Sequence, residues 1–145
     1  MKALSRNSLL LLVLLLPALP PTALKAQTVV IVNESVTAEA LSVKELMDVY
    51  TLNKTHWADG SRIAVFDLKS GKTKDEFLSS VGMSENGLKR IWLRKQFTGR
   101  GRPPRAVSSD DEVMELVAHT PGAIGYVGAD SYKDTRNVRI IARVD

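Results

Sequence analysis

Short runs of β-branched and other apolar residues alternate along this chain with segments of helical periodicity, and this alternation constrains the fold most strongly. The runs that predict strands are Thr28 to Val32, Ile63 to Phe66, Ala123 to Val127 and Val138 to Val144. A continuous β-branched run such as the first is typical of a strand that is buried on both faces. Because predicted strands alternate with predicted helices, the fold class is α/β. No repeat or long linker interrupts the pattern, which indicates one domain over residues 27–145.

Polar residues mark where the predicted helices begin. Ser42 with Glu45, and Ser109 with Glu112, have the spacing of a capping box, in which each side chain bonds the backbone of the other residue. The stretch from Thr98 to Arg105 holds two Gly and two Pro in eight residues. We expect it to be neither helix nor central strand, because proline cannot donate a backbone hydrogen bond.

The first 26 residues have the features of a secretory signal peptide. Lys2 and Arg6 supply positive charge, and the apolar run from Leu9 to Leu16 is far shorter than the about 20 residues that span a bilayer. We expect cleavage after Ala26, with Ala23 as the alternative, and a periplasmic location. Cleavage after Ala26 removes three cations and no acid, so the formal net charge falls from +4 to +1.

Catalytic and metal-binding patterns are missing from the sequence. There is no cysteine, and the two histidines, His56 and His119, have no carboxylate or second histidine at metal-ligand spacing. The acidic triplet Asp110 to Glu112 falls in the first turn of a predicted helix, where it complements the helix dipole. The sequence therefore predicts a protein that is not an enzyme and that needs no cofactor or metal.

The segment Ser70-Gly71-Lys72-Thr73 ends like a nucleotide-binding P-loop, but it is not one. That motif requires glycine at position 66, where this chain has Phe66. A Ser-Gly turn that enters a helix does expose backbone N–H groups at the positive end of the helix dipole, which suits a small oxyanion. The alternative is an ordinary helix N-cap.

Seven cations and no acid lie between Glu85 and Asp110. They are Lys89, Arg90, Arg94, Lys95, Arg100, Arg102 and Arg105. A solvated helix face explains the first four, whereas Arg100 and Arg102 lie in a Gly-Pro loop, where binding residues are often mounted. Such a loop can hold an anion through bidentate arginine contacts. Nucleic acid is an unsuitable partner, because an exported chain of net charge +1 has little general attraction for it.

Several segments together resemble the phosphate-type periplasmic solute-binding proteins. They are Tyr50 to Trp57 (YTLNKTHW), Asp59-Gly60, Ser70-Gly71-x-Thr73, Phe97 to Gly101 (FTGRG) and Thr120 to Val127 (TPGAIGYV). The last is the most specific, and together they cover most of residues 28–128. The resemblance implies a shortened type 2 periplasmic-binding-protein-like fold without catalysis. It also implies phosphate held by a Ser-Gly-Thr turn and delivered to a membrane ABC importer.

The chain departs from that family in length and in its phosphate-binding residues. Lys72 interrupts the Ser-Gly-Thr turn, Phe66 stands where the family has arginine, and Asp67 beside it opposes an anion. Two functions stay open. The first is an oxyanion-binding protein whose ligand contacts Ser70, Gly71, Lys72, Thr73 and Arg100. The second is a periplasmic interaction or sensory module that kept the fold, lost the ligand and meets a protein partner or an anionic membrane component through the loop from Arg100 to Arg105.

Overall fold

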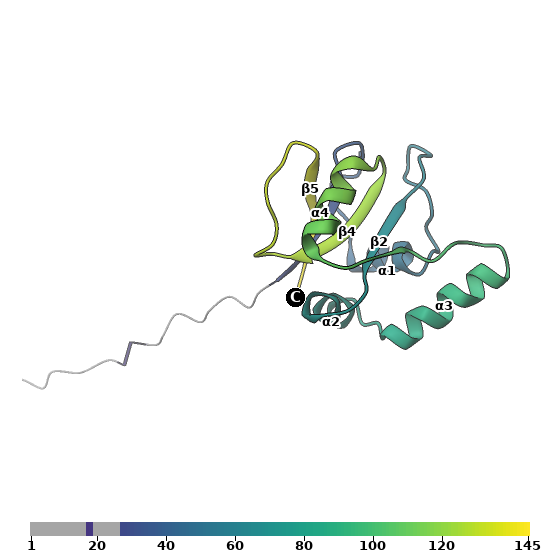
Figure 1. Cartoon of the computed structure of the whole chain (residues 1–145), viewed down its shortest axis with the longest axis horizontal. Coiled ribbons are helices and arrows are strands. Elements are labelled where there is room, and N and C mark those ends of the chain that lie inside the picture. Colours follow the sequence, from purple (N-terminus) through teal and green to yellow (C-terminus); the bar gives the residue numbers. More distant parts are fainter. Residues whose placement is uncertain (1–16, 19–26) are drawn as a thin grey trace, which may run out of the picture.

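The predicted α/β fold is confirmed, with five strands rather than four in the described part of the chain. The computed structural model describes residues 17–18 and 27–145, so the predicted signal peptide lies outside the described residues apart from Pro17 and Ala18. The strands are β1 (Thr28–Asn33), β2 (Ala64–Leu68), β3 (Arg105–Val107), β4 (Ala123–Gly128) and β5 (Val138–Val144). The helices are α1 (Val43–Tyr50), α2 (Lys72–Ser80), α3 (Glu85–Phe97) and α4 (Asp110–His119) (Figure 1).

The strands form one mixed sheet in the order β3-β2-β4-β1-β5. Strand β2 runs parallel to β3 and β4, whereas β1 runs antiparallel to β4 and β5. Every residue of β1 is buried, as its unbroken β-branched run predicts. The register places Val29 opposite Val127 on one side of β1 and opposite Arg143 on the other.

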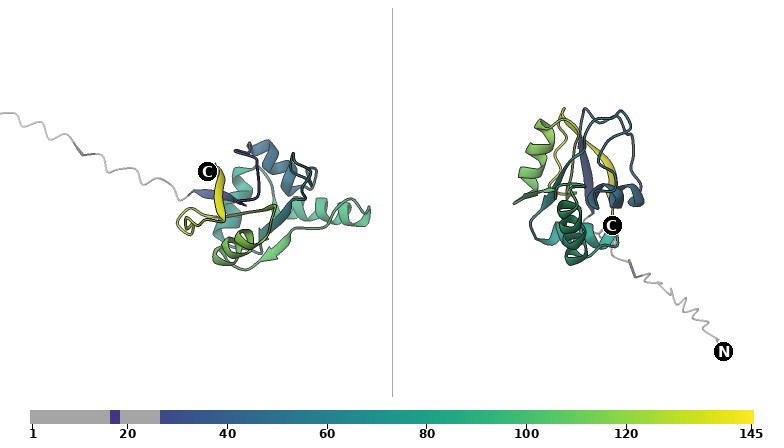
Figure 2. Two further views of the ribbon diagram at one scale, coloured as in Figure 1. Left: turned by 90° about the horizontal axis from the view of Figure 1, so that it is seen from above. Right: turned by 90° about the vertical axis from the view of Figure 1, so that its right-hand side faces the viewer.

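Two neighbouring residues of β4 show how helices cover both faces of the sheet. The ring of Tyr126 stacks on that of Phe77 in α2, with centroids 4.0 Å apart, and lies 5.8 Å from that of Tyr50 in α1. A Cβ atom on Gly125 would instead meet Val113 of α4 at 2.6 Å. Because successive side chains of a strand point to opposite faces, α4 covers one face and α1 and α2 cover the second (Figure 2).

The capping box that the sequence predicts is complete at α1 and partial at α4. At α1, the backbone N–H of Glu45 donates to the hydroxyl of Ser42 at 3.2 Å, and the N–H of Ser42 donates to the Glu45 carboxylate at 2.8 Å. At α4, the hydroxyl of Ser109 accepts from the N–H of Glu112, but the Glu112 carboxylate accepts from Ser108 instead. The second predicted capping box is therefore only half formed.

The Gly-Pro loop ends one residue earlier than the sequence predicts. Arg105 begins the three-residue strand β3, which lies at the edge of the sheet and pairs in parallel with β2 from Phe66 to Leu68. The edge position explains how a strand can start directly after Pro104, because only one of its sides needs ladder hydrogen bonds. None of the helices within 17–18 and 27–145 has the length and apolarity needed to cross a membrane.

Candidate functional site

The turn Ser70-Gly71-Lys72-Thr73 lies where β2 ends and α2 begins. Gly71 is the N-cap residue, with φ of +108°, a backbone conformation that favours glycine. No side chain caps this helix, whereas Ser42, Ser84 and Ser109 cap α1, α3 and α4. The backbone N–H groups at 72, 73 and 74 have no acceptor among the described residues. Ser70, Gly71 and Lys72 are exposed, Thr73 is half-buried and Lys74 is buried, so the turn presents backbone donors mainly through residues 72 and 73, at the positive end of a helix dipole.

The starts of α2 and α4 converge on the last residue of β4, Gly128. A Cβ atom at this glycine would lie 3.5 Å from the hydroxyl of Thr73 and 3.3 Å from the carboxylate of Asp110. The N–H of Gly128 donates to that carboxylate at 2.9 Å. The closest contact of such a Cβ atom would be with the carboxylate of Asp130, at 2.7 Å, so a side chain at Gly128 would displace Asp130 rather than either helix start.

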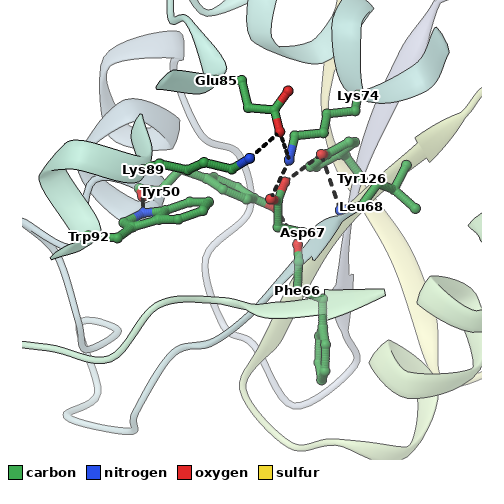
Figure 3. Close-up of polar contacts among 9 residues, drawn as sticks. All are labelled: Tyr50, Phe66, Asp67, Leu68, Lys74, Glu85, Lys89, Trp92 and Tyr126. Atoms are coloured by element: carbon green, nitrogen blue, oxygen red, sulfur yellow. Dashed lines mark hydrogen bonds and ion pairs between the residues drawn. The ribbon is translucent and has the colours of Figure 1, made fainter. Parts of the chain in front are cut away.

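A buried ion pair lies behind the turn, between Asp67 of β2 and Lys74 of α2 (Figure 3). Their side chains are 3.0 Å apart, and the two residues are only 4% and 3% exposed. The hydroxyl of Tyr126 donates to the other Asp67 oxygen at 2.6 Å and accepts from the N–H of Leu68 at 3.3 Å. Asp67 was expected to oppose an anion, but its charge is compensated within the fold.

The tyrosines around Asp67 stay protonated. Burial, and after it the negative charge of Asp67, raises the pKa of both Tyr50 and Tyr126 above the usual range. Tyr50 donates to the carbonyl oxygen of Phe66 at 3.1 Å, so both hydroxyls act as donors to β2. The arrangement fixes the strand that leads into the Ser-Gly turn.

The ion pair is linked to the surface through α3. Lys74 also lies 3.7 Å from the carboxylate of Glu85, and that carboxylate is 2.7 Å from Lys89. Lys89 first, and then Lys74, lower the pKa of Glu85. The sequence analysis did not predict this network. One signal was present, because Lys74 lies on the same face of α2 as the apolar residues Phe77 and Leu78 and is therefore expected to be buried.

Arg100 lies apart from the Ser-Gly turn. It lines a groove of about 1110 Å³ beside Ile63 and Val65, at the start of β2, and the turn follows the end of the same strand. The structure therefore brings Ser70, Gly71, Lys72 and Thr73 together and leaves Arg100 at a second place.

The two histidines lie on the surface and bond locally. One ring nitrogen of His56 is 2.9 Å from the hydroxyl of Thr55, and one of His119 is 2.8 Å from the carbonyl oxygen of Glu115. Among the residues that the structure describes, no three metal-ligating side chains gather in one place.

Comparison with known proteins identifies the fold. The chain is similar to an ABC-type phosphate transport receptor from Vibrio cholerae, with a TM-score of 0.63 and 19% identity over 80% of this chain and 45% of that one. The fold is a shortened periplasmic-binding-protein fold. A phosphate ABC transporter substrate-binding protein with bound phosphate from Clostridium perfringens matches with a TM-score of 0.59 and 17% identity, over 82% and 55% of the two chains.

A third similar structure is that of a possible phosphate binding protein from Planctomyces limnophilus, with a TM-score of 0.59 and 18% identity over 80% of this chain and 40% of that one. The shortened binding-protein fold therefore spans about half the length of these structures. No family model matches the sequence, and no curated protein does. The likeness is one of fold, to proteins named for binding and transport rather than for catalysis.

Proposed function

We propose that this protein is an exported solute-binding-like protein that holds phosphate or a similar oxyanion at the start of α2. The observation that carries the proposal is the set of three backbone N–H groups, at residues 72 to 74, that have no acceptor among the described residues. The fold supports it, because one similar structure holds bound phosphate. Ordered donors and a helix dipole at an exposed turn are what an oxyanion requires.

Each residue of the turn would contribute differently to that site. Gly71 adopts the backbone conformation from which α2 begins. Ser70 and Thr73, which flank the turn, would add their hydroxyls as side-chain donors. Lys72 adds positive charge; its side chain is 79% exposed and lies 3.5 Å from Glu76. We leave Arg100 out of this site, because it lines the groove at the other end of β2.

Export and delivery belong to the same proposal. A signal peptide over residues 1–26 would place residues 27–145 in the periplasm, where a membrane ABC importer or another periplasmic protein would receive the ligand. Periplasmic fractionation of cells that express the full chain tests this part. Protein retained at full size in the cytoplasm would contradict it.

Titration with phosphate, sulfate and molybdate tests the oxyanion site, and two substitutions of one residue locate it. Lys72→Ala removes the cation but keeps the backbone donor, whereas Lys72→Pro removes both at the first helical position, where proline is tolerated. We expect Lys72→Pro to weaken phosphate binding by about tenfold more than Lys72→Ala, since a hydrogen bond to a charged group contributes roughly 1.5–3 kcal/mol. Calorimetry measures both affinities.

Thermal unfolding provides the control for that titration. A ligand that binds only the folded protein raises the melting temperature, and both variants should melt near the unmodified protein without phosphate. An unmodified protein that shows neither heat of binding nor a higher melting temperature at millimolar phosphate contradicts the oxyanion site.

An interaction module is the second candidate function, and one observation favours it. Phe97, at the end of α3, is 88% exposed, and Leu93, one turn earlier, is also exposed. The far end of α3 projects from the body of the protein (Figure 1). If this function is correct, phosphate gives no signal in the titration, and Phe97→Ser abolishes crosslinking of α3 to a periplasmic protein.

A further inference from the structure

The groove that contains Arg100 is lined by four cations and by no acidic residue. Lys54 and Arg62 come from the connection between α1 and β2, and Arg100 and Arg102 come from the loop after α3. The buried side chains of Leu52 and Ile63 also line it, whereas the three arginines are exposed. Two segments that are far apart in sequence thus bring positive charge to one concave surface.

None of these four cations forms an ion pair with a described residue, although the charge of Lys54 also acts on the carboxylate of Glu45. Each of the five ion pairs in the described part of the chain involves other cations, namely Lys44, Lys72, Lys74 and Lys89. Lys54 instead lies over the ring of Trp57, with its nitrogen 5.9 Å from the ring centroid. Like charges that share a groove raise its positive potential, and that potential attracts an anion carrying several charges.

The wall formed by α3 and the following loop is hydrogen-bonded to the end of α1. The indole N–H of Trp92 donates to the carbonyl oxygen of Tyr50 at 2.7 Å, and Lys95 donates to the carbonyl oxygen of Leu52 at 3.3 Å. A Cβ atom on Gly101 would lie 3.2 Å from Leu52, so the loop backbone between the two arginines packs directly on that side chain.

Leu52 itself has φ of +62°, a conformation that is rare for a branched side chain and is kept only where the surroundings hold it. The backbone that carries Arg100 and Arg102 is therefore packed on a residue that is itself held in place. A wall of this kind keeps its charges near the groove when no ligand is bound.

We propose that this groove binds a ligand with two or more linked phosphoryl groups, at a site separate from the start of α2. Guanidinium groups form paired hydrogen bonds with phosphoryl oxygens, and three arginines can contact successive groups of one chain. A groove of about 1110 Å³ is slightly larger than typical small-ligand sites of about 300–1,000 Å³. A single orthophosphate would leave most of it unfilled and would reach only part of the charge.

Titration of the purified protein with orthophosphate, pyrophosphate, tripolyphosphate and adenosine diphosphate tests the proposal. We expect affinity to rise along the inorganic series, with tripolyphosphate binding at least about tenfold more tightly than orthophosphate, and to weaken with added salt. The adenosine diphosphate arm identifies the source of the phosphoryl groups. Binding weaker than that of pyrophosphate indicates an inorganic chain, and tighter binding indicates an organic diphosphate.

Substitutions locate the groove and separate it from the α2 site. Arg100→Ala with Arg102→Ala should weaken tripolyphosphate binding about tenfold or more, and Arg62→Gln, in the connection between α1 and β2, should also weaken it. Lys72→Pro should leave tripolyphosphate binding unchanged. The test of the groove is therefore independent of whether the start of α2 binds an oxyanion.

The matched control removes two exposed cations from the connection between β4 and β5, by Lys133→Ala with Arg136→Ala. This connection lies on the opposite side of the molecule from the far end of α3 (Figure 1). Equal affinity for orthophosphate and tripolyphosphate would overturn the proposal. Equal weakening by the control pair would overturn it too, since it would show general attraction to the protein's charge.

Discussion

Replacing Lys74 with Ala is expected to lower the free energy of unfolding by about 3–5 kcal/mol, because it breaks a buried ion pair by removing one partner. The change leaves the carboxylate of Asp67 without its partner at 3.0 Å, in a place where Asp67 is only 4% exposed. The hydrogen bond from Tyr126 remains, but it cannot supply a compensating charge. Urea denaturation followed by circular dichroism measures the difference, with the slope of the transition compared to exclude a change of denatured state.

Lys72→Ala is the matched control for Lys74→Ala, because the two lysines belong to the same helix turn and only Lys72 is exposed. The ion pair of Lys72 with Glu76 is on the surface, and exposed pairs contribute about 0–1 kcal/mol. A double variant that also carries Asp67→Asn removes the unpaired charge, so its loss should be smaller than the sum of the two single losses. A Lys74→Ala loss no larger than that of Lys72→Ala would contradict the buried pair.

The predictable part of this fold depends on local patterns. The β-branched run at β1 marks a strand buried on both faces, and Ser42 with Glu45 marks the start of α1, because both signals act within a few residues. Strand β3 gives no such signal. It has three residues after two prolines, and it exists because Phe66 and its neighbours offer an open edge to pair with.

The candidate sites divide in the same way. The donors of the Ser-Gly turn could be predicted, because the end of β2 and the start of α2 are adjacent in sequence. The pairing of Lys74 with Asp67 required knowledge of which face of α2 is buried. The groove could not be found from sequence at all, since Arg62 and Arg100 are brought together only by the contacts of α3 and its loop with the end of α1.

Replacing Gly122 with Ala is the second substitution with a large expected effect, a loss of about 2–5 kcal/mol. Gly122 has φ of +74°, which costs an L side chain about 1–2 kcal/mol. A Cβ atom there would also collide with the carbonyl oxygen of Arg62, and overpacking of this kind typically costs a further 1–3 kcal/mol. The backbone is held from both sides, because the N–H of Gly122 donates to Ser35 and its carbonyl oxygen accepts from Trp57.

Gly82→Ala separates the two causes of the Gly122→Ala loss. Gly82 has nearly the same backbone conformation, with φ of +70°, but a Cβ atom there would meet no heavy atom within 4 Å. Gly82→Ala should therefore lower the free energy of unfolding only by the cost of the backbone conformation, about 1–2 kcal/mol. Equal losses at the two positions in urea denaturation would show that the turn relaxes away from Arg62. A larger loss at Gly122 would show instead that the hydrogen bonds to Ser35 and Trp57 hold the turn against the start of β2, where Arg62 lines the groove.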